Sequence, residues 1–185
     1  MVEIRWHSRA GQGAVTGAKG LGDVIARTGK EVQAFALYGS AKRGAAMTAY
    51  NRVSDVQIIN HAKFMNPNYI LVIDPALAYT SDIIYDDRED TKYIITTHLS
   101  PEELKAEIPA LKDKEVYTVD CIDISMETIG RSMPNTPMLG ALMKVSGMFE
   151  IDFFKESMVS VLSKFPQKII DANMDAITRA YNEVK

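Results

Sequence analysis

The sequence of 185 residues contains one cysteine, one tryptophan and no long apolar run. The single cysteine, Cys121, excludes an intrachain disulfide framework and cannot hold an iron–sulfur cluster, which needs about four thiolates. An apolar run of about eighteen residues and a charged-then-apolar leader are both missing, which argues against a membrane span and against export. We therefore expect a cytoplasmic protein that does not contact a membrane.

Side chains that commonly perform catalysis are also sparse. The three histidines, His7, His61 and His98, are tens of residues apart, so structural roles are favoured over metal ligation. Cys121 lies between Asp120 and Asp123, and nearby acids raise the pKa of a thiol, which disfavours a nucleophilic role. The sequence has no Gly-Asp-Gly segment followed by paired asparagines, so it shows no site for thiamine diphosphate and magnesium. We expect the chain to be inert when isolated and to hold no metal.

The charge is unevenly distributed along an acidic chain. Residues 1–52 hold eight Lys and Arg against three acids, a net charge of +5, whereas the whole chain carries −3. A basic first quarter in an acidic protein favours a local anion site over a nucleic-acid surface, which is usually basic overall. Solvated charges scattered over the surface are the alternative interpretation.

Length and periodicity predict a single α/β domain, residues 1–185. Alternation of Val2, Ile4 and Trp6 with polar residues predicts a half-buried strand. Further strands are expected at residues 31–38, 45–53, 69–74, 92–98 and 116–120. Helices are expected at residues 14–28, from Pro75 to Tyr85 and from Ser100, whose capping box includes Glu103. This alternation predicts a three-layer, doubly wound, mostly parallel sheet.

The final third, residues 136–185, is predicted to be a helical segment. Its three runs extend from Thr136 to about Phe149, from Asp152 to Lys164, and onward from Gln167. The last run carries an apolar stripe that we interpret as core or as a contact with another subunit: Ile170, Met174, Ile177 and Tyr181. In the first helix, we expect Gly17, Gly20 and Gly22 to allow close packing on the sheet.

A glycine-containing turn joins the first strand to the first helix. The turn is Ser8-Arg9-Ala10-Gly11-Gln12-Gly13, and it leaves backbone N–H groups free at a helix N-terminus, where the helix dipole favours anions. Arg9 adds a charge and a planar donor fork. A dinucleotide fits poorly, because Thr16 replaces the third glycine of the fingerprint and the second strand ends without an acid. We predict a site for a multiply phosphorylated ligand.

The second strand ends in small and basic residues, Gly39, Ser40, Lys42 and Arg43. We expect Arg43 to neutralise the charge of the phosphorylated ligand together with Arg9.

Two blocks of sequence combine into a more specific pattern. The first is Glu3-Ile4-Arg5-Trp6-His7-Ser8-Arg9-Ala10-Gly11-Gln12-Gly13-Ala14. The second comprises, in order, Gln33-Ala34-Phe35, Tyr38-Gly39, Arg43-Gly44-Ala45 and Ala49-Tyr50-Asn51-Arg52-Val53. In order and spacing, both resemble the gamma subunits of the 2-oxoacid:ferredoxin oxidoreductase family, particularly those of pyruvate:ferredoxin oxidoreductase. The family commonly has glycine where this chain has Ala10, and glutamate where it has Ala41.

The resemblance implies a subunit of an enzyme that oxidatively decarboxylates pyruvate to acetyl-CoA and passes electrons to ferredoxin. It implies that alpha, beta and delta subunits hold the thiamine diphosphate, magnesium and iron–sulfur clusters. This chain would bind coenzyme A and close the active site, with Arg9, Gly11, Gln12, Gly13, Tyr38, Gly39 and Arg43 as binding residues.

Three alternatives remain open from the sequence. The first is a subunit for another 2-oxoacid, branched-chain or 2-oxoglutarate. The second is an assembly subunit without a ligand of its own, and the third is a stand-alone nucleotide-dependent oxidoreductase.

Overall fold

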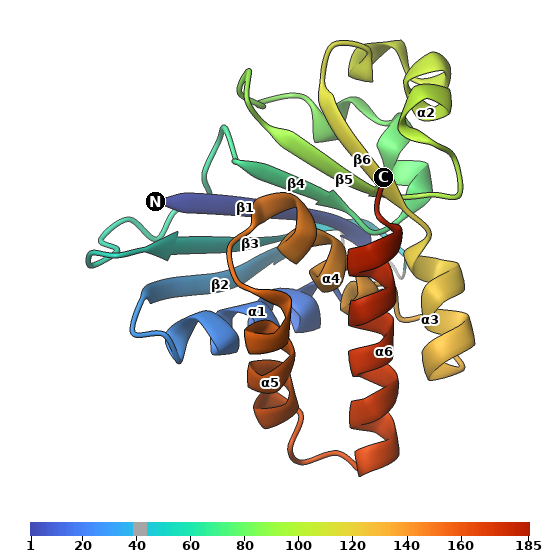
Figure 1. Cartoon of the computed structure of the whole chain (residues 1–185). Helices are drawn as coiled ribbons and strands as arrows, with labels where there is room; N and C mark the ends of the chain where they lie inside the picture. Colours follow the sequence, from blue (N-terminus) through green and yellow to red (C-terminus); the bar gives the residue numbers. More distant parts are fainter. Residues whose placement is uncertain (39–43) are drawn as a thin grey trace.

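The computed structural model describes residues 1–38 and 44–185 and contains a six-stranded sheet (Figure 1). The strand order is β2-β3-β1-β4-β5-β6. The strands are β1 (Val2–Arg9), β2 (Glu31–Tyr38), β3 (Ala46–Ser54), β4 (Tyr69–Val72), β5 (Lys92–Thr96) and β6 (Glu115–Val119). Strands β1, β4, β5 and β6 are parallel, whereas β3 runs antiparallel to both of its neighbours. The predicted mostly parallel sheet is confirmed.

Helices cover the two faces of the sheet unequally. One face is covered by α1 (Ala14–Ala26), α3 (Cys121–Ile129), α4 (Asn135–Ser146), α5 (Ile151–Val161) and α6 (Gln167–Glu183) (Figure 1). The other face packs against α2 (Pro101–Glu107) and the short 3-10 turns Pro75–Tyr79, Ser81–Ile83 and Pro109–Leu111. This confirms the three-layer arrangement and the helical C-terminal segment.

Two local predictions need correction, and one helix was missed. The stretch from Pro75 to Tyr85 is not one helix but two 3-10 turns, because Thr80 has an extended backbone between them. The helix α3 was not expected; the Asp120 side chain caps it by accepting a hydrogen bond from the Asp123 N–H at 3.0 Å. Finally, β1 is buried on both faces rather than half-buried, because it is a central strand.

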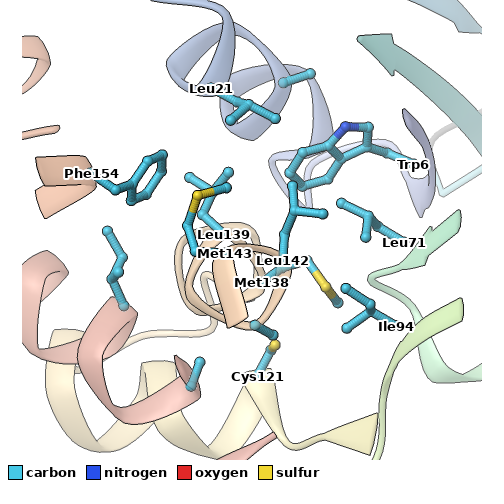
Figure 2. Close-up of a cluster of buried hydrophobic side chains, with 14 of the residues drawn as sticks. Trp6, Leu21, Leu71, Ile94, Cys121, Met138, Leu139, Leu142, Met143 and Phe154 are labelled. Carbon is cyan, nitrogen blue, oxygen red and sulfur yellow. The ribbon is translucent and has the colours of Figure 1, made fainter. Parts of the chain in front are cut away.

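The helix α4 is the centre of the helical layer. Every residue from Asn135 to Met143 is buried, so this helix is enclosed on all sides. Figure 2 shows side chains of the sheet, Trp6 and Ile94 among them, on one side of α4, with Phe154 of α5 on another. The stripe on α6 joins the same cluster, which identifies it as core.

Glycines set how closely the helices approach. Gly17 lies against the Trp6 ring and Gly22 against Ala34 of the sheet, as predicted, whereas Gly20 faces Met158 of α5 instead. The closest approach is between α4 and α6. A Cβ atom added to Gly140 would lie 2.0 Å from the backbone oxygen of Ile177. The clash cannot be relieved by a side-chain rotation, because it is with backbone, and α4 is enclosed while the facing side of α6 is packed in the core. Among the described residues, none of the helices has the length and apolar character to span a membrane.

We predict that Gly140→Ala lowers the free energy of unfolding by about 3 kcal/mol or more, since overpacking of a core typically costs 1–3 kcal/mol and here the overlap is with backbone. Urea unfolding followed by circular dichroism measures the change. Gly20→Ala is the matched control, because its new methyl would lie 3.7 Å from Met158 Cε. Alanine there should be neutral or stabilising by up to about 1 kcal/mol. Equal effects of the two substitutions would contradict this account of α4 and α6.

Candidate functional site

The candidate site lies at the carboxyl end of β1, where the chain connections on the two sides of this strand lead away from each other. From β1 the chain passes through α1 to β2 on one side, yet the parallel neighbour of β1 on its other side is β4. The loops that follow β1 and β4 therefore diverge at the carboxyl edge of the sheet. In α/β sheets, ligands bind in the crevice at such a switch point. Residues 9–13 and Asp74 lie together at this edge.

The loop after β1 requires its glycines. Gly11 and Gly13 have φ angles of 101° and 86°, in the left-handed region that favours glycine. Gly13 is the N-cap of α1; no side chain of the described residues caps this helix, and its first turn contains no acid. The backbone N–H groups and the dipole of α1 are therefore available at this edge, as an anion site needs.

Arg9 is positioned by other groups of the site. Its Nε lies 3.2 Å from Asp74 Oδ2, and its Nη1 donates to the Gly44 oxygen at 3.0 Å. The Arg9 side chain remains 41% exposed, whereas that of Asp74 is 11% exposed. The guanidinium thus faces solvent with part of its charge compensated by a less accessible carboxylate.

Gln12 serves the loop itself. Its Oε1 accepts from the Arg9 N–H at 2.7 Å, and its Nε2 donates to Asp74 Oδ2 at 2.6 Å. Both the carbonyl and the amide group of Gln12 are thereby hydrogen-bonded, so the role of this side chain is to stabilise the conformation of the loop. Asp74 was missed by the sequence interpretation, although an acid before Pro75 at the end of a buried parallel strand is a usable signal.

The other predicted site residues lie at the end of β2. Tyr38 is 69% exposed and lines a cavity of about 340 Å³ that adjoins the carboxyl edge. Gly39 and Arg43 lie outside the described residues, as do the residues between them. The structure therefore brings together Arg9, Gly11, Gln12 and Gly13.

Asn135 is a second residue that the sequence interpretation missed. It begins α4, is buried, and packs so closely that a Cβ atom on Gly13 would lie 2.7 Å from its Cγ. Its side chain makes no hydrogen bond to the described part of the chain. The N-termini of α1 and α4 consequently meet behind the loop.

The polar face of β1 continues from Arg9 to His7 and Arg5. Arg5 is buried, pairs with Asp86, and donates through Nε to His7 Nε2 at 3.0 Å. Burial first, and the Arg5 charge second, lower the pKa of His7 from 6.5 to about 3. His7 is accordingly neutral at pH 7.

Neither cysteine nor metal chemistry is apparent in the described residues. Burial raises the pKa of the Cys121 thiol to about 12, so it remains protonated and unreactive. Residues 1–38 and 44–185 contain no group of three or more His, Cys, Asp and Glu side chains placed to bind a metal ion. The site can hold and orient an anion, and it offers no nucleophile of its own there.

We predict that His7 makes the fold acid-sensitive. The unfolded chain takes up this proton near pH 6.5 and the folded chain near pH 3, so the unfolded state binds more protons between these values and stability falls as the pH is lowered. Between pH 7 and pH 4.5 the loss attributable to His7 should be roughly 2–3 kcal/mol, at 1.36 kcal/mol per pKa unit. The control variant His7→Gln retains an acceptor for Arg5 but has no titrating group at this position. It should therefore lack the part of the stability loss that His7 causes. Parallel losses in both proteins on urea unfolding would refute the assignment.

Comparison with known proteins gives matches along almost the entire chain. A family model described as pyruvate ferredoxin/flavodoxin oxidoreductase matches residues 3–183. The pyruvate synthase subunit PorC of Thermotoga maritima is 38% identical over 184 residues, which cover 99% of this chain and 94% of that protein. The crystal structure of pyruvate oxidoreductase subunit PORC from the same organism has a TM-score of 0.85 and covers 100% of this chain and 97% of that one, at 38% identity.

Two further matches differ in the 2-oxoacid that their names specify. The pyruvate/ketoisovalerate oxidoreductases common subunit gamma of Pyrococcus abyssi is 34% identical over 185 residues, covering 100% of this chain and 98% of that protein. A 2-oxoglutarate:ferredoxin oxidoreductase from Magnetococcus marinus, solved with 2-oxoglutarate, coenzyme A and succinyl-CoA bound, has a TM-score of 0.75. At 19% identity, over 98% of this chain and 30% of that one, it shares the fold.

Proposed function

Since the chain belongs to the pyruvate ferredoxin/flavodoxin oxidoreductase family, we propose that it is the gamma subunit of a pyruvate:ferredoxin oxidoreductase. In this role it binds coenzyme A and closes an active site formed by the alpha, beta and delta subunits. The complex converts pyruvate and coenzyme A to acetyl-CoA and carbon dioxide and passes two electrons to ferredoxin. We also infer that residues 1–185 act as one domain.

The observation that carries this proposal is the loop from Arg9 to Gly13. It combines an exposed guanidinium, two glycines with positive φ and the uncapped N-terminus of α1 at the switch point of the sheet. Coenzyme A carries a diphosphate and a 3′-phosphate, the type of ligand that backbone N–H groups and guanidinium groups bind together. Gln12 and Asp74 hold the loop in this conformation.

The reactive groups belong to the partner subunits in this proposal. Thiamine diphosphate, magnesium and the iron–sulfur clusters would supply decarboxylation and electron transfer there. In this chain Cys121 is buried and His7 is neutral and engaged with Arg5. Its contribution is to orient the carrier so that the thiol reaches the acyl group in the neighbouring site.

Two other roles have support of their own. The name of the Pyrococcus abyssi relative specifies both pyruvate and ketoisovalerate, which favours a gamma subunit that serves more than one 2-oxoacid. Exposed apolar side chains on and beside α5 and α6 favour a purely assembling role: Phe153, Val159, Phe165 and Ile169. The experiment below separates this second role from carrier binding.

We predict that Arg9→Gln raises the KM for coenzyme A about tenfold in the complex purified through a tag on this chain, because a charge-assisted contact is worth about 1.5–3 kcal/mol. The KM for pyruvate should stay unchanged. Asp74→Asn places an amide donor where Asp74 accepts from Gln12 Nε2 or from the Ala76 N–H, so it should disturb the loop and also raise the KM for coenzyme A. Steady-state kinetics at fixed ionic strength measure both.

The charge-matched control is Lys30→Gln, since Lys30 pairs with Asp55 at the opposite end of β2. It should change neither KM. Wild-type coenzyme A kinetics in Arg9→Gln, together with impaired assembly, would favour the assembling role and reject carrier binding at this loop.

A further inference from the structure

A second hollow lies on the polar face of β1, beside the proposed phosphate site. The cavity of about 340 Å³ contains His7 and Arg5 of β1, together with their register partners Thr48 and Tyr50 of β3. Lys63 and Phe64 line it from the segment after β3, and Tyr38, Asp82 and Tyr85 are also in its lining.

His7 presents an unused donor in this cavity. Because Arg5 donates to Nε2 and the ring is neutral, the imidazole proton is on Nδ1. No hydrogen bond joins Nδ1 to a residue of the described part of the chain, although the side chain is only 5% exposed. Nδ1 keeps access to the open space of the cavity, so an acceptor on a bound molecule can pair with it.

Tyr50 and Phe64 of the cavity are fixed in place. Tyr50 stacks on Phe35 with ring centroids 4.9 Å apart, and Phe64 meets Tyr50 edge-on at 5.1 Å. Arg52 lies over the Phe64 ring, with its Cζ 5.1 Å from the centroid. Tyr50 and Phe64 therefore form a rigid wall of the cavity, whereas the rings of Tyr38 and Tyr85 are exposed and open to a flat ligand.

The charges in the cavity disfavour an anionic ligand. Arg5 is paired with Asp86, and the remaining charged groups of the lining, Lys63 and Asp82, have opposite signs. A neutral heterocycle suits this balance better than a phosphate, since a ring nitrogen accepts from His7 and an exocyclic amine donates to a carboxylate such as Asp82.

We propose that this cavity binds the adenine-type base of the carrier whose phosphates bind at residues 9–13. His7 and Arg9 are two residues apart on one face of β1, about 7 Å along the strand, which is comparable to the separation of a nucleotide base from its 5′-phosphate. Tyr38 lines the cavity at the strand ends, beside this carboxyl edge. The inference rests on the proposed function, because it assigns the second half of the same carrier.

The test compares two thiol substrates in the purified complex. Coenzyme A has the base, and pantetheine has the same reactive arm without the nucleotide. Thr48→Phe should fill the cavity, raise the KM for coenzyme A at least tenfold and leave the kinetics with pantetheine unchanged. His7→Gln keeps an acceptor for Arg5 and replaces the Nδ1 donor by an amide N–H in a different position, so it should produce a smaller increase in the same direction.

A measurement that does not depend on activity uses the full chain alone. Titration with adenosine 3′,5′-bisphosphate should shift the nuclear magnetic resonance signal of the His7 Nδ1 proton, and Thr48→Phe should abolish that shift. Absence of the shift in the wild type, with binding detected elsewhere or nowhere, would overturn the assignment of the base.

Arg9→Gln distinguishes failure of this inference from failure of the proposed function. If Arg9→Gln raises the KM for coenzyme A but both cavity variants behave as wild type, the carrier binds here and its base lies elsewhere. If all three variants leave that KM unchanged, carrier binding by this chain and the assignment of its base fail together.

Discussion

The alternation of side chains along β1 is the constraint on which the rest of the structure depends. Ile4 and Trp6 enter the helical layer, while Arg5, His7 and Arg9 lie on the opposite face. Since the period of a strand is two residues, a shift of register by one would place the charged side chains in the core. The hydrogen bond from Trp6 Nε1 to Asn51 Oδ1, 2.9 Å long, and the pairing of Arg5 with Asp86 anchor the two faces in their respective layers.

The helical segment supports the site from behind. The buried α4 packs against α6 so closely that Gly140 leaves no room for a side chain, and its first residue, Asn135, lies against Gly13. The conformation of the loop therefore depends on residues more than a hundred positions away. At the edge strand β6, Lys185 exchanges two backbone hydrogen bonds of 3.0 Å with Thr118, which ties the C-terminal end of α6 to the sheet (Figure 1).

In the proposed function, the described residues contribute recognition of the carrier. The histidine on the polar face is neutral and the thiol is buried, while the groups open to solvent near the carboxyl edge are the Arg9 guanidinium, backbone N–H groups and aromatic side chains. In a multisubunit enzyme this division is physically reasonable, because a carrier must be oriented by one surface while its reactive end remains free. The Asp74 carboxylate partly neutralises the positive charge of Arg9. This weakens the attraction of Arg9 for anions that lack the correct shape and so favours selective binding.

Much of the fold follows from local sequence. Alternating residues in β1, the apolar run of β4, the capping box at Ser100 and the three helical runs after Thr136 each predict an element that the structure contains. The turn at Gly11 and Gly13 is also predictable, because positive φ angles select glycine whatever surrounds them. These features depend on neighbours within a few residues, which the sequence displays directly.

Contacts between distant residues were decided by the tertiary structure alone. The sequence shows neither that Asp74 would compensate Arg9, nor that Asn135 would lie behind Gly13, nor that Tyr50 and Phe64 would adjoin His7. The same holds for the burial of β1 on both faces, which follows from its central place in the strand order. Periodicity specifies which face of an element is apolar, whereas the partner of a polar side chain depends on how the whole sheet and its helices are arranged.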